Sequence, residues 1–283
     1  MREYSVKKIL LFVGLATALL MPACSRLDLA YTWADTYIAS KVDDYFDLSW
    51  KQSRALKKSL HADLEKLKQS VLPAWIHTAR DLEKSVAENS LSDKKIAPLF
   101  SSIMAEVERF TGYFSTTAAD FISSINAQQL AHFEKEVRSK NSADLKKIKD
   151  TEKYRREMRE KYHKYFEMFI GRLTPAQETL LEKHLSENPF PAELRIKNKE
   201  FLLQQFSRHA SSFADLQTFV RDYYSHPEKY KDPVYESAFQ SYKESLGRLV
   251  TGVLTSLTTE QRNTLRTNLR EKIEELEKIQ RKG

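Results

Sequence analysis

Apolar residues recur every three or four positions along most of the chain beyond residue 26, which is the spacing that one buried helix face requires. No run of alternating apolar and polar residues, as a half-buried strand would need, competes with this pattern. The pattern predicts an all-α fold of long antiparallel helices without a β-sheet. The helical segments are 27–46, 49–71, 73–88, 93–110, 114–122, 126–137, 154–170, 175–187, 192–224, 233–255 and 259–281.

Turn-forming residues separate several of these segments. Gly112 interrupts the apolar pattern, Gly171 is placed to end a helix, and Asn188-Pro189-Phe190-Pro191 is a clear break. Residues 138–153 are rich in charge and predict a turn followed by a solvent-exposed helix.

Four predicted helix starts share one pattern: an apolar residue, then Ser, Thr or Asn, then Gln three positions later. This is the capping box, in which the cap side chain and the glutamine each accept a hydrogen bond from a free backbone N–H of the first turn. The apolar residue in front is available as a hydrophobic staple. The copies are Leu48, Ser49 and Gln52; Ile125, Asn126 and Gln129; Leu173, Thr174 and Gln177; and Leu257, Thr258 and Gln261.

The spacing of these copies suggests two pairs. Position 173 lies 125 residues after position 48, and position 257 lies 132 residues after position 125. We interpret this as an internal duplication that gives two related helical bundles, residues 47–140 and 141–283, after an N-terminal helix at 24–46. Chance recurrence of a common capping motif is the alternative.

The first 23 residues have the composition of a signal peptide. A positive start with Arg2, Lys7 and Lys8 precedes an apolar run from Ile9 to Met21. That run is shorter than the roughly 20 apolar residues that a membrane-spanning helix needs. Cys24, the single cysteine of the sequence, follows directly.

The stretch Leu20-Met21-Pro22-Ala23-Cys24-Ser25 resembles the lipobox of bacterial lipoproteins. The resemblance implies cleavage before Cys24, its acylation with chains such as palmitate, and attachment to a membrane. Ser25 in place of aspartate implies the periplasmic face of the outer membrane. The alternatives are an uncleaved anchor and an ordinary signal with a chance cysteine.

Catalytic and metal-binding motifs are absent from the sequence. One cysteine allows neither an internal disulfide nor a cysteine metal cluster, and the seven histidines form no HExxH motif. No GxSxG, Walker or GxGxxG motif occurs. We therefore expect no cofactor, no metal and no enzymatic activity, although an enzyme whose site is assembled from distant residues stays open.

A basic, tyrosine-containing stretch at 146–164 is the candidate binding segment. Its functional interpretation is a surface for protein clients, carried by Lys153, Tyr154, Arg155, Arg156, Arg159 and Tyr162. The alternative is an amphipathic helix whose tyrosines pack inward and whose charges face water. A net charge of +7 is mild, and an exported location argues against nucleic acid as a partner.

Two further resemblances rest on these motifs. Leu173 to Gln177 and Leu257 to Gln261 are similar to the LTxxQ motif of the periplasmic Spy and CpxP proteins, which bind misfolded clients on a concave, basic surface. Tyr45 to Gln52, Trp75 and Leu173 to Gln177 resemble an uncharacterised family of proteobacterial helical lipoproteins. That second resemblance implies location and fold, and no residue roles.

Two functions follow as hypotheses. The first is a lipid-anchored, non-enzymatic protein that binds unfolded or envelope clients in a Spy-like manner. The second is an assembly lipoprotein that docks a membrane partner through its aromatic N-terminal helix, with Tyr31, Trp33 and Tyr37 close to the anchor. Core packing of these aromatic side chains is the competing interpretation.

Overall fold

The computed structural model describes residues 26–282, and no residue in this range lies in a strand, so the all-α prediction is confirmed. Short 3₁₀ helices, η1 (Phe110–Phe114) and η2 (Pro227–Tyr230), link some of the α-helices. The α-helices are α2 (Arg26–Thr32), α3 (Ala34–Phe46), α4 (Trp50–Ser70), α5 (Leu72–Ala87), α6 (Asp93–Arg109), α7 (Ser115–Ser123), α8 (Ala127–Ile148), α9 (Thr151–Ile170), α10 (Pro175–Glu187), α11 (Ala192–His209), α12 (Phe213–Ser225), α13 (Pro233–Thr255) and α14 (Thr259–Arg281).

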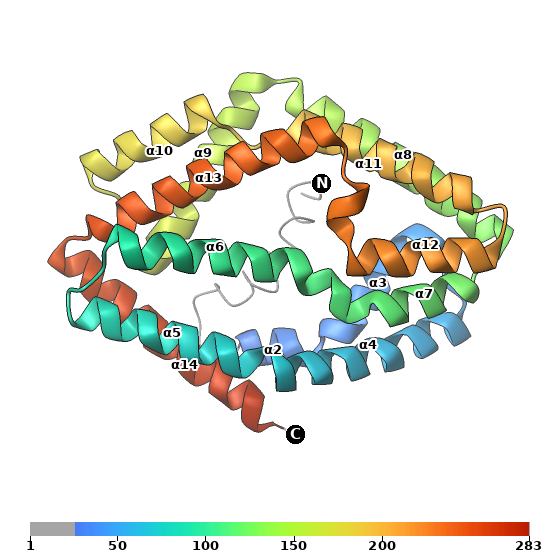
Figure 1. Ribbon diagram of the computed structural model, residues 1–283, viewed down its shortest axis with the longest axis horizontal. Coiled ribbons are helices and arrows are strands. Elements are labelled where there is room, and N and C mark those ends of the chain that lie inside the picture. Colours follow the sequence, from blue (N-terminus) through green and yellow to red (C-terminus); the bar gives the residue numbers. More distant parts are fainter. Residues whose placement is uncertain (1–25, 283) are drawn as a thin grey trace.

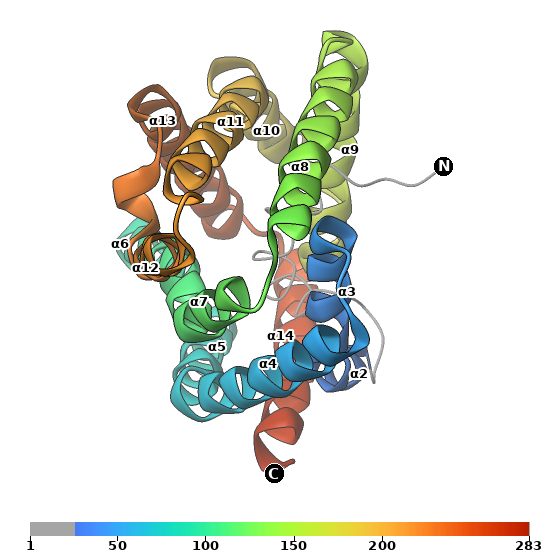
Figure 2. The ribbon, with the colours of Figure 1, turned by 90° about the vertical axis from the view of Figure 1, so that its right-hand side faces the viewer.

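Helices α5 to α9 follow one another around the molecule, and α10 to α14 return along them in the opposite order. Helix α5 packs against α14, α6 against α13, α7 against α12, α8 against α11, and α9 against α10. The paired helices trace an oval ring (Figure 1). In the view turned by 90°, α8 and α9 lie on one side of the ring and α6, α12 and α13 on the other (Figure 2). Helices from the two predicted halves are thus interlocked around the ring.

The contacts follow an approximate two-fold pattern. Helices α4, α5, α6, α7 and α8 can be matched in order with α10, α11, α12, α13 and α14. Under this matching, the contact between α5 and α14 corresponds to the contact between α11 and α8. Likewise, the contact between α6 and α13 corresponds to that between α12 and α7, and the contact between α4 and α7 to that between α10 and α13. This pattern supports the duplication, which stays a prediction.

The core is divided into four apolar clusters instead of one. One cluster lies between α3, α4 and η1, a second between α9, α10, α13 and α14, and a third between α7, α8, α11 and α12. The fourth joins Leu27 of α2 to Leu72 and Ile76 of α5 and to the end of α14. Each fully buried Leu or Ile contributes about 1.5–3 kcal/mol, so apolar burial stabilises the ring all around its circumference.

Three predicted boundaries are wrong. The segment 27–46 is broken at Trp33, and 192–224 is split at residues 210–212, where Ser212 caps α12. The turn predicted after residue 137 does not form, because α8 continues to Ile148. Its polar residues Asn141 and Asp144 are buried against α11, which holds the charge-rich stretch helical.

Two glycines have roles that other residues would fill poorly. Gly171 has a φ of 80° and ends α9 as expected. Gly252 lets α13 approach α10 closely, since a Cβ atom there would lie 2.8 Å from Cδ1 of Leu180.

The predicted signal segment 1–23 and Cys24 lie outside the described residues. Within residues 26–282, no helix has both the length and the apolar character needed to cross a bilayer.

Candidate functional site

All four helix-start motifs form capping boxes, at the first turns of α4, α8, α10 and α14. They are also joined in two pairs. The side-chain amides of Gln52 and Gln129 exchange two hydrogen bonds of 3.0 Å, which we call the first glutamine pair. Gln177 and Gln261 do the same at 3.1 and 2.8 Å and form the second glutamine pair. Each pair lies within one of the predicted halves.

Both glutamine pairs follow one rule. Each side-chain Nε2 also donates to the backbone carbonyl two residues before the opposite cap. Gln52 thus reaches Ser124 and Gln129 reaches Asp47, at 2.8 and 3.1 Å. In the second pair, Gln177 reaches Ser256 and Gln261 reaches Arg172, at 3.3 and 2.7 Å. The motif therefore closes a loop of five helices in each half, α4 to α8 and α10 to α14.

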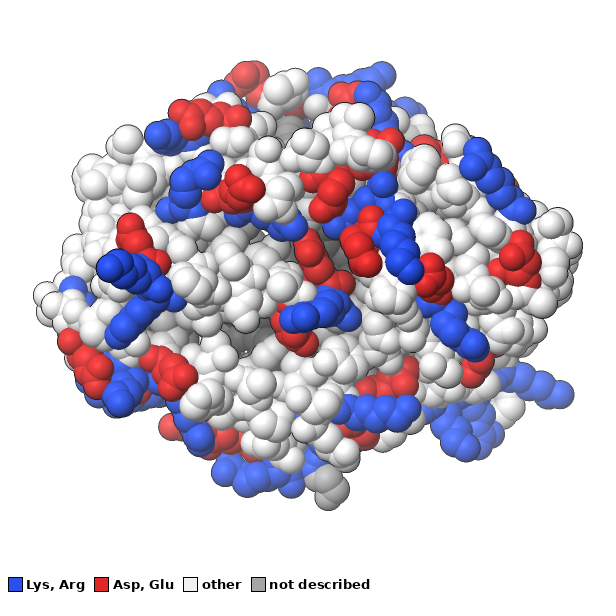
Figure 3. Space-filling view, viewed as in Figure 1, with Lys and Arg blue, Asp and Glu red and all other residues white. Residues whose placement is uncertain are grey.

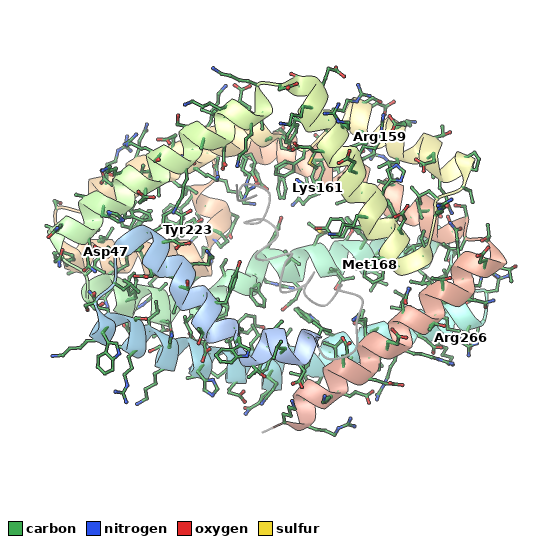
Figure 4. All side chains as sticks on the ribbon, turned by 180° about the vertical axis from the view of Figure 1, so that it is seen from behind. Asp47, Arg159, Lys161, Met168, Tyr223 and Arg266 are labelled. Atoms are coloured by element: carbon green, nitrogen blue, oxygen red, sulfur yellow. The ribbon has the colours of Figure 1, made fainter. Side chains whose placement is uncertain are left out.

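The six predicted client-binding residues divide between two sides of α9. Figure 4 shows Lys161 and Met168 on the side of α9 that faces the centre of the ring and Arg159 on the opposite side. Tyr154 lies two turns before Lys161 and shares its side. Tyr154 and Tyr162 are half-buried, whereas Lys153, Arg155 and Arg156 are exposed.

The outer side of α9 forms a shallow groove. Glu152, Arg155, Arg156 and Arg159 line it, and Arg159 donates to Glu182 of α10 at 2.5 Å. Acidic and basic side chains alternate over the face of the ring shown in Figure 3 without a large region of one sign. On α9, Lys153, Arg155 and Arg156 are exposed and Arg159 is half-buried.

Aromatic side chains of α9 and α13 form a cluster, which we call the tyrosine face. Its members are Tyr154, Tyr162, Phe239 and Tyr242, which are half-buried, and Tyr235, which is buried. On α13 the rings of Tyr235 and Phe239 stack with centroids 5.5 Å apart, and those of Phe239 and Tyr242 stack at 6.0 Å. The hydroxyls of Tyr162 and Tyr242 are 2.8 Å apart and hydrogen-bonded. Phe190, from the break before α11, meets Tyr242 edge to face at 5.2 Å.

A buried histidine supports the tyrosine face from behind. His184 of α10 is hydrogen-bonded through Nε2 to Tyr162 and through Nδ1 to Ser245, both at 2.8 Å. Burial, with a smaller effect from Arg248, lowers the pKa of His184 to about 4. The ring is therefore neutral at pH 7, with one nitrogen donating and the other accepting.

Burial limits the chemistry that this network can perform. Ser245 is hydrogen-bonded to His184 as a nucleophile would be to its base, but both side chains are buried, so a substrate has no described path to the serine hydroxyl. Within residues 26–282, no three His, Cys, Asp or Glu side chains are grouped closely enough to hold a metal ion.

Burial raises the pKa of many inner tyrosines. The pKa values of Tyr154, Tyr235 and Tyr223 of α12 rise to about 12, with burial as the largest cause. Figure 4 shows Tyr223 on the inner side of the ring. These phenols stay protonated at any physiological pH and are therefore neutral hydroxyl donors.

Sequence reasoning missed His184, Arg195, Tyr235 and Tyr242. The spacing of Tyr235, Phe239 and Tyr242 places them on one face of a helix, and this signal was present in the sequence. His184 and Ser245 gave no signal, because only the packing of α10 against α13 brings them together.

The aromatic residues near the N-terminus differ in how far they are exposed. The Tyr31 hydroxyl donates to Glu65 of α4 at 2.9 Å. Leu29, Trp33 and Tyr37 lie one helical turn apart and are 59%, 58% and 48% exposed. Core packing therefore accounts for Tyr31 and not for Trp33 or Tyr37.

The comparisons with known proteins place this chain in a family. No curated protein and no solved structure matches the sequence. The model of DUF6279, a family of unknown function, matches residues 44–222 and so covers more than half of the sequence, from the end of α3 to α12. The match includes the first glutamine pair, Gln177 and part of the tyrosine face. The chain belongs to the DUF6279 family.

Proposed function

We propose that this protein is a non-enzymatic lipoprotein, anchored through acylated Cys24 on the periplasmic face of the outer membrane, that binds unfolded or envelope protein clients on the inner side of its ring. The observation that carries the proposal is the tyrosine face. Its residues Tyr154, Tyr162, Phe239 and Tyr242 are only half-buried, so they retain aromatic surface that a polypeptide can contact.

The chemistry of this surface suits unfolded polypeptides. Tyrosines provide large contact areas at a low entropic cost and hydroxyls that can bond a peptide backbone. A Spy-like mode would place clients on a concave, basic surface. Here the aromatic side of α9 replaces its basic side as the contact surface.

An acyl anchor fits the position of the first described helix. Helix α2 begins two residues after Cys24, so the ring would be held against the membrane by a short link. Each buried CH₂ group contributes about 0.8 kcal/mol, which makes release of a protein with two or three acyl groups negligible. Once the leader has been removed, the Cys24→Ala protein is expected in the soluble fraction, and continued membrane association of the cleaved protein would contradict the anchor.

Client binding can be tested by suppression of aggregation. The protein without residues 1–24 is expected to keep an unrelated, thermally unfolding protein soluble at near-stoichiometric amounts. Tyr154→Ser, on the inner side of α9, should weaken this protection several-fold. The double variant Arg155→Glu and Arg156→Glu, on the outer side of the same helix, should not. The absence of protection by the unaltered protein would refute the proposal.

A second function is favoured by the exposed residues Leu29, Trp33 and Tyr37. Their position next to the anchor fits an assembly lipoprotein that docks a membrane partner with this face. A photoreactive residue at Trp33 or Tyr37 should then give one dominant crosslinked partner, and Tyr31, whose hydroxyl is bonded inside the protein, is the matched control. A diffuse set of partners from Trp33 would contradict this function.

A further inference from the structure

An unpaired cation lies beside the tyrosine face. Arg195, in the first turn of α11, is half-buried, and no other described residue forms a hydrogen bond or ion pair with its guanidinium. The guanidinium instead makes a cation–π contact with Phe190, whose ring centroid is 5.9 Å away. A half-buried arginine without a carboxylate is unusual, because desolvation of its charge is not compensated. Burial accordingly lowers the pKa of Arg195.

Acidic groups near Arg195 have other partners. Asp144 of α8 accepts a hydrogen bond from Lys199 of α11 at 3.1 Å. Glu200 is bonded to Arg138 and Asn141, and Glu236 is paired with Lys231 at 2.7 Å. None of these three carboxylates is hydrogen-bonded or ion-paired to Arg195 in the described structure, although the charge of Asp144 acts on the guanidinium and favours its charged form.

Two hydroxyl donors face the same place. The charge of Arg195 acts on the phenols of Tyr154 and Tyr235, where it opposes the rise in pKa that burial causes. Neither hydroxyl is bonded to another described residue, although Tyr162 and Tyr242 of the same face are bonded to each other. The geometry links these groups: Arg195 lies over the ring of Phe190, the centroid of Phe190 is 6.4 Å from that of Phe239, and Phe239 stacks on the buried Tyr235. A guanidinium of α11 and a hydroxyl of α13 thus lie beside the half-buried rings of Phe190 and Phe239, with Tyr154 of α9 within reach of the charge of Arg195.

The contact with Phe190 covers one face of the guanidinium and leaves its N–H groups without a described acceptor. A ligand that carries oxygen acceptors would satisfy these N–H groups.

We propose that Arg195, with the hydroxyls of Tyr154 and Tyr235, binds a carboxylate of a client polypeptide, while Phe190 and Phe239 contact an aromatic side chain next to it. The fork of an arginine matches a carboxylate with two parallel hydrogen bonds. The carboxylate can belong to the C-terminus of the client or to one of its acidic residues. This inference deepens the proposed function and rests on it.

Calorimetric titration with short peptides tests the inference. An eight-residue peptide that ends in phenylalanine with a free carboxylate is compared with its C-terminal amide. The free acid is expected to bind the unaltered protein at least tenfold more tightly. Arg195→Gln should remove this preference, Arg195→Lys should restore part of it, and Arg208→Gln, at an exposed position of the same helix, should leave it unchanged.

Further peptides distinguish the source of the carboxylate and separate the two proposals. Binding of an amidated peptide with an internal Glu-Phe pair would assign the site to acidic residues, and its failure would assign the site to C-termini. Equal binding of acid and amide, or an affinity for inorganic phosphate equal to that for the peptide, would overturn the inference. If aggregation is suppressed while acid and amide bind alike, the client-binding function survives and the carboxylate site does not. Circular dichroism at each titration temperature verifies that every variant is folded.

Discussion

The two glutamine pairs have the same hydrogen bonds and different surroundings. In the second pair, Gln177 and Gln261 are 0% and 4% exposed, and Leu257 beside them is buried. In the first pair Gln129 is also buried, at 7% exposed, but Gln52 is only half-buried. Water can therefore reach a hydrogen bond lost by Gln52 more easily than one lost by Gln177. The same sequence motif therefore sets the same local geometry with very different energetic consequences.

The largest loss of stability is expected when the buried Gln177 is replaced. Gln177→Ala should lower the free energy of unfolding by about 3 kcal/mol, because it leaves the Thr174 N–H, the Ser256 carbonyl and the buried Gln261 amide short of partners. Urea denaturation followed by circular dichroism measures this loss. Gln177→Glu keeps the shape of the residue and serves as a second variant. A loss below 1 kcal/mol for Gln177→Ala would show that water enters the second pair.

Acid should weaken the half that contains the second pair. His184 has a pKa of about 4 in the folded protein and about 6.5 when unfolded, so the unfolded protein takes up the proton first as the pH falls. The stabilisation is complete above pH 6.5 and is lost progressively down to pH 4. Between pH 7 and pH 5 the free energy of unfolding should fall by about 2 kcal/mol from this residue.

Two variants isolate this histidine. His184→Gln should flatten the pH dependence, whereas His77→Gln, which changes an exposed histidine of α5, should retain it. An unchanged slope in His184→Gln would mean that another group carries the acid sensitivity.

Replacing a glutamine of the first pair should lower the free energy of unfolding by less. Gln52→Ala removes the same two kinds of hydrogen bond, but solvent reaches the site, so the expected loss is about 1 kcal/mol. Urea denaturation under the conditions used for Gln177→Ala gives the comparison. A loss as large as that of Gln177→Ala would remove the distinction between the two pairs.

The smallest difference in stability between the two pairs is expected when their cap residues are replaced. Ser49→Ala and Thr174→Ala each remove one side-chain bond to the backbone of the first turn, at 3.3 Å in both cases. Each change should cost about 1 kcal/mol, with less than about 0.5 kcal/mol between them, because the cap is a local interaction. Measured unfolding free energies that differ by more than this would show that tertiary burial reaches the cap as well.

Local patterns predicted the helices and their starts well. The boundaries of α13 and α14 and all four capping boxes follow from spacing and cap residues alone. The glutamine pairing was out of reach, since a capping box gives no sign that its glutamine has a second partner 77 or 84 residues away. The turn predicted after residue 137 failed for the same reason: Asn141 and Asp144 look solvent-exposed in sequence and are bonded to α11 in the fold.

The proposed binding surface uses Tyr154 and Tyr162 of the predicted segment and leaves out its cations, and neither choice has been tested. The many basic residues of α9 favoured a client-binding surface that included Lys153, Arg155 and Arg156, and these side chains are exposed. Its tyrosines gain their surroundings from α13 and α11, more than 70 residues and more than 30 residues further along the sequence. Arg195 became a candidate only when the described structure gave it no partner.

The most direct test of client binding compares the two sides of α9 in contact with a client. A photoreactive phenylalanine analogue is placed at Met168, on the inner side, or at Arg156, on the outer side, and each protein is irradiated with an unfolded client protein. We expect a crosslinked product from position 168 and none from position 156. A product from position 156 alone would contradict binding on the inner side of the ring.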